Sequence, residues 1–153
     1  KLEIYQKKRA TKQVGFLIFQ EYIEHNFEWR CVRIGDSFFA HKKLKIGEMA
    51  SGTLLKSYDN PPLELLDFVK DVTDKLNFSS LAIDIFETSN GEYLVNEMQC
   101  YFGQSDAFQM KVDDRIGRYR HMNGNWVFEE GDFARNACYD LRLHHLLEIL
   151  QKR

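Results

Sequence analysis

Three polar side chains around one predicted turn are expected to share one face of a β-sheet, and the two carboxylates among them could bind a metal ion. In the segment 81–104, two runs of alternating polar and apolar residues flank an Asn-Gly pair at positions 90–91. Such a pair predicts a β-hairpin with a two-residue type I′ turn, because this turn needs positive φ at both central residues. Counting outward from the turn places Asp84 opposite Glu97, with Gln99 further along the same face.

Two chemical interpretations of this face follow from the residues. Carboxylates opposite each other on a sheet repel, and a bound Mg²⁺ removes the conflict because it accepts one or two carboxylates together with substrate phosphates. The alternative is a solvated sheet face on which the two acids avoid each other. Both interpretations depend on the register, because a slip of one residue would move Glu97 to the other face. That other face is expected to pack against the core through Ile83, Ile85, Leu94 and Met98.

The elements that must position this hairpin come before it. Residues 14–23 form a continuous apolar run rich in aromatic and β-branched residues, which predicts a buried strand. Residues 28–34 and 37–44 predict two further strands, joined by a turn at Gly35-Asp36. Short connections of this kind favour an antiparallel meander.

Two helices and a second hairpin complete the predicted elements. Asn60-Pro61-Pro62 predicts the start of a helix that ends near Asn77, and Asn123-Gly124-Asn125 predicts the turn of another hairpin. The segment 132–153 predicts a C-terminal helix, whose expected buried stripe is Leu141, Leu143, Leu146, Leu147 and Leu150. The predicted fold class is α+β, an antiparallel β-sheet with packed helices.

The whole chain is typical of one globular domain. Its 153 residues are 44% hydrophobic, and we divide them into a basic lead-in segment (1–13), a main unit (14–112) and a C-terminal extension (113–153). With 21 Lys and Arg against 23 Asp and Glu, no nucleic-acid partner is expected, and no apolar run approaches the roughly 20 residues of a membrane helix. Three cysteines without metal-type spacing predict reduced thiols and a cytoplasmic protein.

The hairpin also resembles a known signature. Asp84, Glu97 and Gln99 are similar to the metal-binding residues of the ATP-grasp superfamily, in which an Asp on one strand is followed by Glu-x-Asn on the next. Gln99 replaces the final Asn and carries its amide oxygen one methylene further out. The resemblance implies a Mg²⁺ or Mn²⁺ ion at these three residues and the C-terminal subdomain of an ATP-grasp fold.

The segments before the hairpin extend the resemblance to a nucleotide site. Gln20, Glu21, Tyr22 and Ile23 resemble the family's adenine-binding hinge, and Glu28 is placed like the acidic residue that holds the ribose hydroxyls. What the resemblance implies is that ATP binds along these residues. Adenine would be contacted there through backbone groups.

Arg30 and Lys43 are similar to the family's basic residues, which implies that they contact the ATP phosphates and act in catalysis. Strand parity places Arg30 and Arg33 on opposite faces, so at most one of them points at the site. A solvated face is expected for Arg33, and also for Lys42 and Lys45.

A third segment of the resemblance lies between the predicted strands and the first predicted helix. Ser51 and Gly52 resemble a small-residue loop beside the active site, where backbone amides could approach a phosphate or an acceptor carboxylate. A flexible connection is the alternative interpretation.

The family's chemistry sets the functional expectation. ATP-grasp enzymes activate a carboxylate as an acyl-phosphate, which an amine or a thiol then attacks, so the resemblance implies a ligase with small-molecule carboxylate and amine or thiol substrates. Nothing before Val14 could supply the family's other nucleotide-binding subdomain, so we expect this chain to be part of a longer enzyme or a reduced relative.

Two other classes of function stay open at this point. An Asp followed by Glu-x-Gln on adjacent strands also occurs in metal-dependent nucleases, although a duplex partner favours a more basic chain. A non-catalytic interaction domain that keeps the fold without its chemistry is the second alternative.

Overall fold

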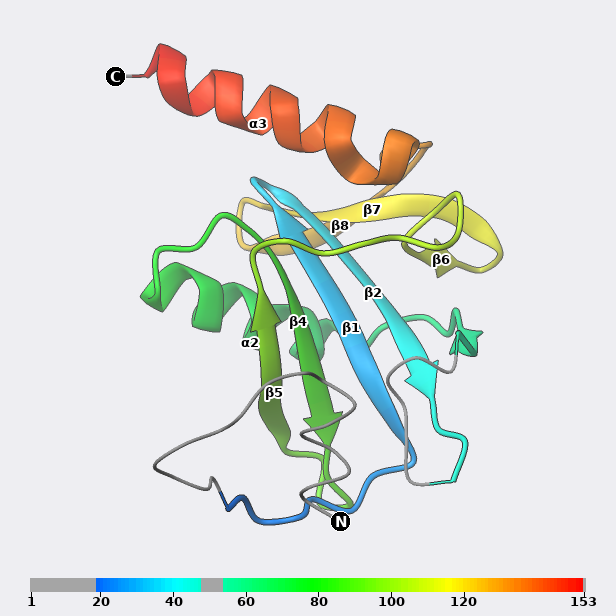
Figure 1. Ribbon diagram of the computed structural model, residues 1–153. Helices are drawn as coiled ribbons and strands as arrows, with labels where there is room; N and C mark the ends of the chain where they lie inside the picture. Colours follow the sequence, from blue (N-terminus) through cyan, green and yellow to red (C-terminus); the bar gives the residue numbers. More distant parts are fainter. Residues whose placement is uncertain (1–18, 48–53, 153) are drawn as a thin grey trace, which may run out of the picture.

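The computed structural model describes residues 19–47 and 54–152, which form an α+β fold, as predicted (Figure 1). An eight-stranded sheet, with every pairing antiparallel, is accompanied by two α-helices. The elements are β1 (Phe27–Ile34), β2 (Ser37–Leu44), β3 (Lys56–Ser57), α2 (Leu63–Lys75), β4 (Ser80–Glu87), β5 (Tyr93–Gln99), β6 (Lys111–Val112), β7 (Arg115–Met122), β8 (Asn125–Glu130), the 3₁₀ turn η1 (Arg135–Cys138) and α3 (Tyr139–Gln151).

The sheet is built around β1, which pairs with β2 on one side and with β4 on the other. Strand order along the sheet is β5-β4-β1-β2-β7-β6, with β3 beside β2 and β8 beside β7. The predicted turn at Gly35-Asp36 joins β1 to β2, and Gly35 has the positive φ (58°) that such a tight turn favours in glycine. Two strands of the predicted meander are therefore confirmed.

The first predicted strand is not formed where the structure describes it. Residues 14–18 of that strand lie outside the described residues, and residues 19–23 have no strand geometry. Phe19 is 88% exposed and Tyr22 is 61% exposed. A strand is stable only when a neighbour satisfies its backbone groups, and both sides of β1 are already occupied by β2 and β4.

The β4–β5 hairpin has the predicted pairing at its functional end but not the predicted turn. Asp84 pairs with Glu97, and Ala82 pairs with Gln99, as expected. The turn is longer, because Glu87 pairs directly with Tyr93 and only Gly91 of the Asn-Gly pair has a positive φ (79°).

A β-bulge between Asp84 and Ile85 restores the register. Ile85 pairs with Val95 and Asp84 with Glu97, so Asn96 is an extra residue on β5. The bulge pairs Leu94 with Phe86, which puts Leu94 on the face of Asp84 and corrects its expected core position. Ile83 and Ile85 are buried as expected, and Met98 packs against the same cluster.

Helix α2 begins and ends where the sequence predicts. Pro62 is its N-cap residue, and Asn77 follows the C-cap in the left-handed conformation (φ 57°). The N–H of Asn77 donates to the carbonyl of Asp74, and the N–H of Phe78 donates to the carbonyl of Thr73. This pair of bonds is the Schellman motif, which satisfies carbonyls that the helix itself leaves unpaired.

Helix α2 covers one face of the sheet. Its buried residues Leu65, Leu66 and Val69 pack in a cluster with residues of β1, β2 and β4, namely Trp29, Cys31, Phe38, Ala40, Leu81, Ile83 and Ile85. On this face Arg33 donates to the Thr73 hydroxyl and to Asp74 (2.5 Å each), which corrects its expected solvated position.

The opposite face of the sheet is apolar at one end and polar at the other. Val32, Ile34 and Phe39 are buried there in a second cluster with Ala82, Phe102, Met110, Val112, Ala134 and Cys138. Alternation along β1 places Glu28 and Arg30 on the same face as Val32 but beyond that cluster. The polar end is therefore the place where charged side chains can gather.

The C-terminal hairpin is confirmed, whereas the C-terminal helix is shorter and more exposed than predicted. Asn123 and Gly124 form the turn between β7 and β8, with φ values of 51° and 80°, whereas Asn125, which was predicted in the turn, is the first residue of β8. Helix α3 begins only at Tyr139, because three consecutive residues before it, Asn136, Ala137 and Cys138, have positive φ (49°, 52° and 63°), which a right-handed helix excludes.

The predicted buried stripe of α3 is wrong. None of its residues is fully buried, and the leucines at positions 143, 146, 147 and 150 are 45–56% exposed. Only Leu141 of the stripe packs, partly buried, against the second cluster. Figure 1 shows the reason, because α3 crosses one end of the sheet and does not lie along its face. Neither described α-helix is long and apolar enough to cross a membrane.

Candidate functional site

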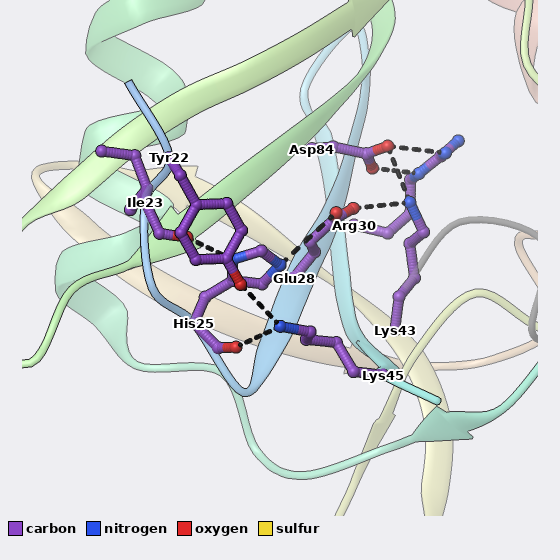
Figure 2. Close-up of polar contacts among 8 residues, drawn as sticks. All are labelled: Tyr22, Ile23, His25, Glu28, Arg30, Lys43, Lys45 and Asp84. Atoms are coloured by element: carbon purple, nitrogen blue, oxygen red, sulfur yellow. Dashed lines mark hydrogen bonds and ion pairs between the residues drawn. The ribbon is translucent and has the colours of Figure 1, made fainter. Parts of the chain in front are cut away.

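Four charged residues from three adjacent strands meet at the polar end of the sheet (Figure 2). Glu28 and Arg30 are on β1, Lys43 is on β2 and Asp84 is on β4. The register makes Glu28 the cross-strand partner of Lys43, and Arg30 the partner of Asp84. Four of the residues predicted from the sequence are therefore brought together.

Asp84 is the centre of this group. Its carboxylate accepts hydrogen bonds from Arg30 Nε (2.5 Å), Arg30 Nη2 (3.0 Å) and Lys43 Nζ (2.9 Å), and it is only 2% exposed. Lys43 Nζ also donates to Glu28 Oε2 at 2.8 Å, and Glu28 is 6% exposed. Two cations thus balance two buried carboxylates, which is the condition under which buried charges are tolerated.

The predicted adenine-binding segment lies beside Glu28. His25 Nδ1 donates to the Ile23 carbonyl at 2.7 Å, its ring centroid is 4.3 Å from that of Phe86, and its Nε2 is 3.9 Å from Glu28 Oε1. Because a carbonyl oxygen only accepts, His25 carries a proton on Nδ1. These contacts hold the end of the segment against β1 and β4.

Lys45 fixes the same segment from the other side. Its Nζ donates to the Tyr22 hydroxyl at 3.2 Å and to the His25 carbonyl at 3.0 Å, so its expected solvated position is wrong (Figure 2). Gln20 and Glu21 are exposed at the start of the described chain.

The predicted metal ligands share a face but differ in environment. Asp84 is buried, its cross-strand partner Glu97 is exposed, and Gln99 lies two residues further along β5. Carboxylate and amide oxygens are the donors that Mg²⁺ accepts, and Mg²⁺ sites commonly use one or two carboxylates with substrate phosphates. The donor set therefore suits Mg²⁺, although no group of three or more His, Cys, Asp or Glu side chains among the described residues is arranged to hold a metal.

A cleft of about 420 Å³ opens beside this group. Arg30, Lys43 and Gln99 from the predicted set line it, together with His41, Leu54, Leu55, Lys56, Gly103, Gln104, Ser105 and Gln109. The predicted acceptor-loop residues Ser51 and Gly52 lie outside the described residues.

His41 is one of the cleft residues that were not predicted from the sequence. It is 4% exposed, its ring is tilted against that of Tyr58, and its Nδ1 is 2.8 Å from the Gln109 carbonyl. Burial, reinforced by the nearby cations Lys56 and Arg30, lowers the pKa of His41 to about 4. Its position two residues before Lys43 on β2 puts both on one face, so strand alternation was a signal that could have found it.

Lys42 belongs to the other face of the sheet. Its Nζ lies 4.3 Å from the ring centroid of Phe27 and 5.0 Å from that of Trp29, and it donates to Asp59 at 2.7 Å. The expected solvated position of Lys42 is therefore wrong as well. A cation over two aromatic rings stabilises the sheet locally and has no access to the cleft.

Comparison with solved structures finds a distant likeness. No protein-family model and no curated protein matches the chain. The crystal structure of macrocyclase MdnB from Microcystis aeruginosa MRC is similar to it, with 19% sequence identity, a TM-score of 0.43, and coverage of 65% of this chain and 33% of that chain. This chain thus spans about a third of the length of that structure. A likeness of this strength establishes neither a family nor an activity.

Proposed function

We propose that this chain binds the nucleotide phosphates and Mg²⁺ in an ATP-dependent ligase of the ATP-grasp type. The observation that carries the proposal is Asp84, which is held by Arg30 and Lys43 and lies opposite Glu97 on the neighbouring strand. Arg30 and Lys43 line the cleft, and together with Asp84 and Glu97 they supply the cations and carboxylates that a magnesium–phosphate complex needs.

Charge balance favours binding of the metal and the phosphates together. A phosphate alone would compete with the buried Asp84 carboxylate for Arg30 and Lys43, which would leave that carboxylate unpaired. A metal ion alone would compete with the same two cations for Asp84. When both arrive, Asp84 and Glu97 would hold the metal while Arg30 and Lys43 turn to phosphate oxygens. Mg²⁺ supplies positive charge that stabilises the transferring phosphoryl group.

The remaining residues have proposed places around this centre. Gln20, Glu21, Tyr22 and Ile23 would contact the adenine of ATP, and Glu28 the ribose hydroxyls. The packing of His25 beside Glu28 and against Phe86 supports this placement, because it holds the adenine-binding segment next to Glu28. Arg30 and Lys43 would stabilise the negative charge that develops as a carboxylate becomes an acyl-phosphate. An amine or a thiol would then displace the phosphate.

A non-catalytic interaction domain is the second candidate. It is favoured by the ion-pair network, in which the hydrogen bonds from Arg30 and Lys43 already neutralise the Asp84 carboxylate. In this alternative Arg30 and Lys43 would serve only to stabilise the sheet.

Electron paramagnetic resonance of Mn²⁺ tests the proposal, because free and bound Mn²⁺ are separately quantified. Mn²⁺ is titrated into the 153-residue chain with and without ATP, and the same titrations are made on Glu97→Gln. We expect ATP to strengthen Mn²⁺ binding and the Glu97→Gln change to weaken ternary binding at least about tenfold, the effect typical of losing even an outer-shell partner.

The matched control is Glu92→Gln, which makes the same chemical change at an exposed position in the turn of the same hairpin. Glu97 is preferred to Asp84 as the test position because removing Asp84 would leave two cations without their shared partner. Equal Mn²⁺·ATP binding by Glu97→Gln and Glu92→Gln would contradict the metal assignment. Absence of binding by the unaltered chain would support the interaction domain.

A further inference from the structure

His41 has a fixed orientation at the wall of the cleft. Its Nδ1 lies 2.8 Å from the carbonyl oxygen of Gln109. Because that oxygen can only accept a hydrogen bond, Nδ1 must carry the proton. A neutral imidazole protonated on Nδ1 has a lone pair on Nε2, so His41 offers a hydrogen-bond acceptor at that atom.

The carbonyl that sets this tautomer is itself held in place. Gln109 is 3% exposed, and its side-chain amide donates to Gln104 Oε1 at 3.0 Å. The Gln104 amide in turn donates to the carbonyls of Asp106 (2.7 Å) and Ala134 (3.1 Å). His41 is therefore oriented by a connected set of hydrogen bonds that leaves the ring little freedom to flip.

The Nε2 atom of His41 has no protein partner in the described chain. Its only hydrogen bond there is made by Nδ1, and no fully buried side-chain nitrogen or oxygen among the described residues lacks a partner. Nε2 is consequently not sealed inside the protein, although His41 as a whole is 4% exposed. The cleft that His41 lines is where Nε2 can meet a ligand.

The electrostatic surroundings favour a neutral ligand group at this position. Burial, together with Lys56 and Arg30, keeps the imidazole uncharged at neutral pH by lowering its pKa to about 4. The same burial and the same cations would disfavour an ammonium ion hydrogen-bonded to Nε2. Leu54 and Leu55 add apolar lining.

We propose that the cleft binds its ligand through a neutral N–H or O–H group that donates a hydrogen bond to His41 Nε2. Assigning that group to the acceptor amine rests on the ligase function proposed above. In that role His41 would bind the amine as its free base, the nucleophilic form, and direct its nitrogen lone pair away from the imidazole. Arg30 and Lys43 line the same cleft, so the amine would be held beside the proposed phosphate site.

Two substitutions separate the structural role of His41 from the proposed one. His41→Asn keeps an N–H near the position of Nδ1, so it retains a donor to the Gln109 carbonyl but removes the acceptor at Nε2. His41→Gln places an amide oxygen near the position of Nε2 and loses the bond to Gln109. If the proposal holds, the Asn variant folds normally and does not bind a small N–H donor such as N-methylacetamide, whereas the Gln variant is less stable and still binds it.

The probes are N-methylacetamide, which has an N–H donor, and N,N-dimethylacetamide, which has none. Nitrogen-15 NMR of the labelled chain follows the His41 ring nitrogens together with the backbone amides of Lys56 and Gln104, which line the cleft. We expect an unprotonated Nε2 whose resonance shifts with N-methylacetamide and not with N,N-dimethylacetamide. The backbone amides should shift in His41→Gln and remain unchanged in His41→Asn.

The proposal would be overturned by a proton on Nε2, by equal responses to the two amides, or by unchanged N-methylacetamide binding in His41→Asn. An Nε2 resonance that no probe moves would equally rule out an acceptor site in the cleft. The experiment uses neither nucleotide nor metal, so its failure is distinguishable from failure of the Mn²⁺ titration. If Mn²⁺·ATP does not bind but N-methylacetamide does, the donor site stands and the ligase assignment falls.

Discussion

The charge state of His41 links single-residue chemistry to the stability of the whole chain. An imidazole that is buried among cations stays neutral when folded, whereas in the unfolded chain it has its ordinary pKa of 6.5. Between these two pKa values the unfolded state binds the extra proton. Protonation therefore favours unfolding in this pH range.

We predict that stability falls as the pH decreases from 6.5 to about 4, the interval between the two pKa values of His41. The free energy of unfolding decreases in this interval because the unfolded chain binds a proton at His41 and the folded chain does not. The full difference corresponds to about 3 kcal/mol. Urea unfolding of the unaltered chain and of His41→Asn, at a series of pH values, measures it.

The variant should have a flatter pH profile over this interval than the unaltered chain. Carboxylates such as Asp106, whose pKa is lowered by hydrogen bonds from Lys56 and Tyr58, also contribute to acid sensitivity, but they do so in both proteins. Parallel profiles would show that His41 has its ordinary pKa in the folded chain and that the cleft does not bury it.

Also at the scale of single residues, strand alternation correctly predicted the sheet face of a side chain but not the residue to which it bonds. It placed Arg30 and Arg33 on opposite faces, and the structure confirms this, with Arg30 bonded to Asp84 and Arg33 bonded to Thr73. It did not predict that Arg33 is held by α2, because the contact spans 40 residues of sequence. Local patterns contain no information about such distant partners.

At the scale of elements, the β4–β5 hairpin shows how a correct pairing can follow from an incorrect turn. The sequence predicted a two-residue turn, and the structure has a longer turn together with a bulge at Asn96. The longer turn shifts the pairing by one residue and the bulge shifts it back, so Asp84 still pairs with Glu97. Leu94 lies between the turn and the bulge, and its face was therefore predicted wrongly.

The two helices show what sequence periodicity leaves undetermined. Both are 13 residues long and both have apolar stripes, yet α2 has four buried residues and α3 has none. An apolar stripe indicates that a helix can bury one face. It does not tell whether a sheet face is available to cover it, and the second sheet face is already covered by residues such as Phe102 and Met110.

This difference predicts unequal effects of one substitution in the two helices. Leu66→Ala in α2, at 0% exposure, should lower the free energy of unfolding by about 2–5 kcal/mol because it leaves a cavity. Leu146→Ala in α3, at 51% exposure, should cost less than about 1 kcal/mol, since Leu and Ala have similar helix propensities. Chemical denaturation monitored by tryptophan fluorescence measures both. Equal costs would indicate that α3 is covered in solution.

At the scale of the whole molecule, the proposed site and α3 lie at opposite ends of the sheet. His145 of α3 bonds to Ser79, just before β4, and sits against the Gly35 turn that joins β1 to β2. Glu28 and Lys43 lie at the other ends of β1 and β2, where the ion pairs with Asp84 are made. Helix α3, which has no buried residue, is thus separated from the part proposed to do chemistry.

This separation predicts that α3 opens locally without disturbing the site. Backbone amides in α3 should exchange with solvent at least about tenfold faster than those in α2, which corresponds to an opening about 1.4 kcal/mol less costly. Hydrogen exchange followed by mass spectrometry compares the two 13-residue helices within one experiment. Under native conditions, the exchange of β1 and β4 should proceed only through global unfolding, because both strands lie in the centre of the sheet.

His145→Ala provides the test, because it removes the bond to Ser79, one of the hydrogen bonds that connect α3 to segments beside the sheet. Exchange in α3 should accelerate while exchange in β1 and β4 changes much less. If all three accelerated equally, α3 would belong to the same cooperative unit as the central strands. The ion pairs around Asp84 would then depend on α3, and the separation between the two ends of the sheet would have no energetic meaning.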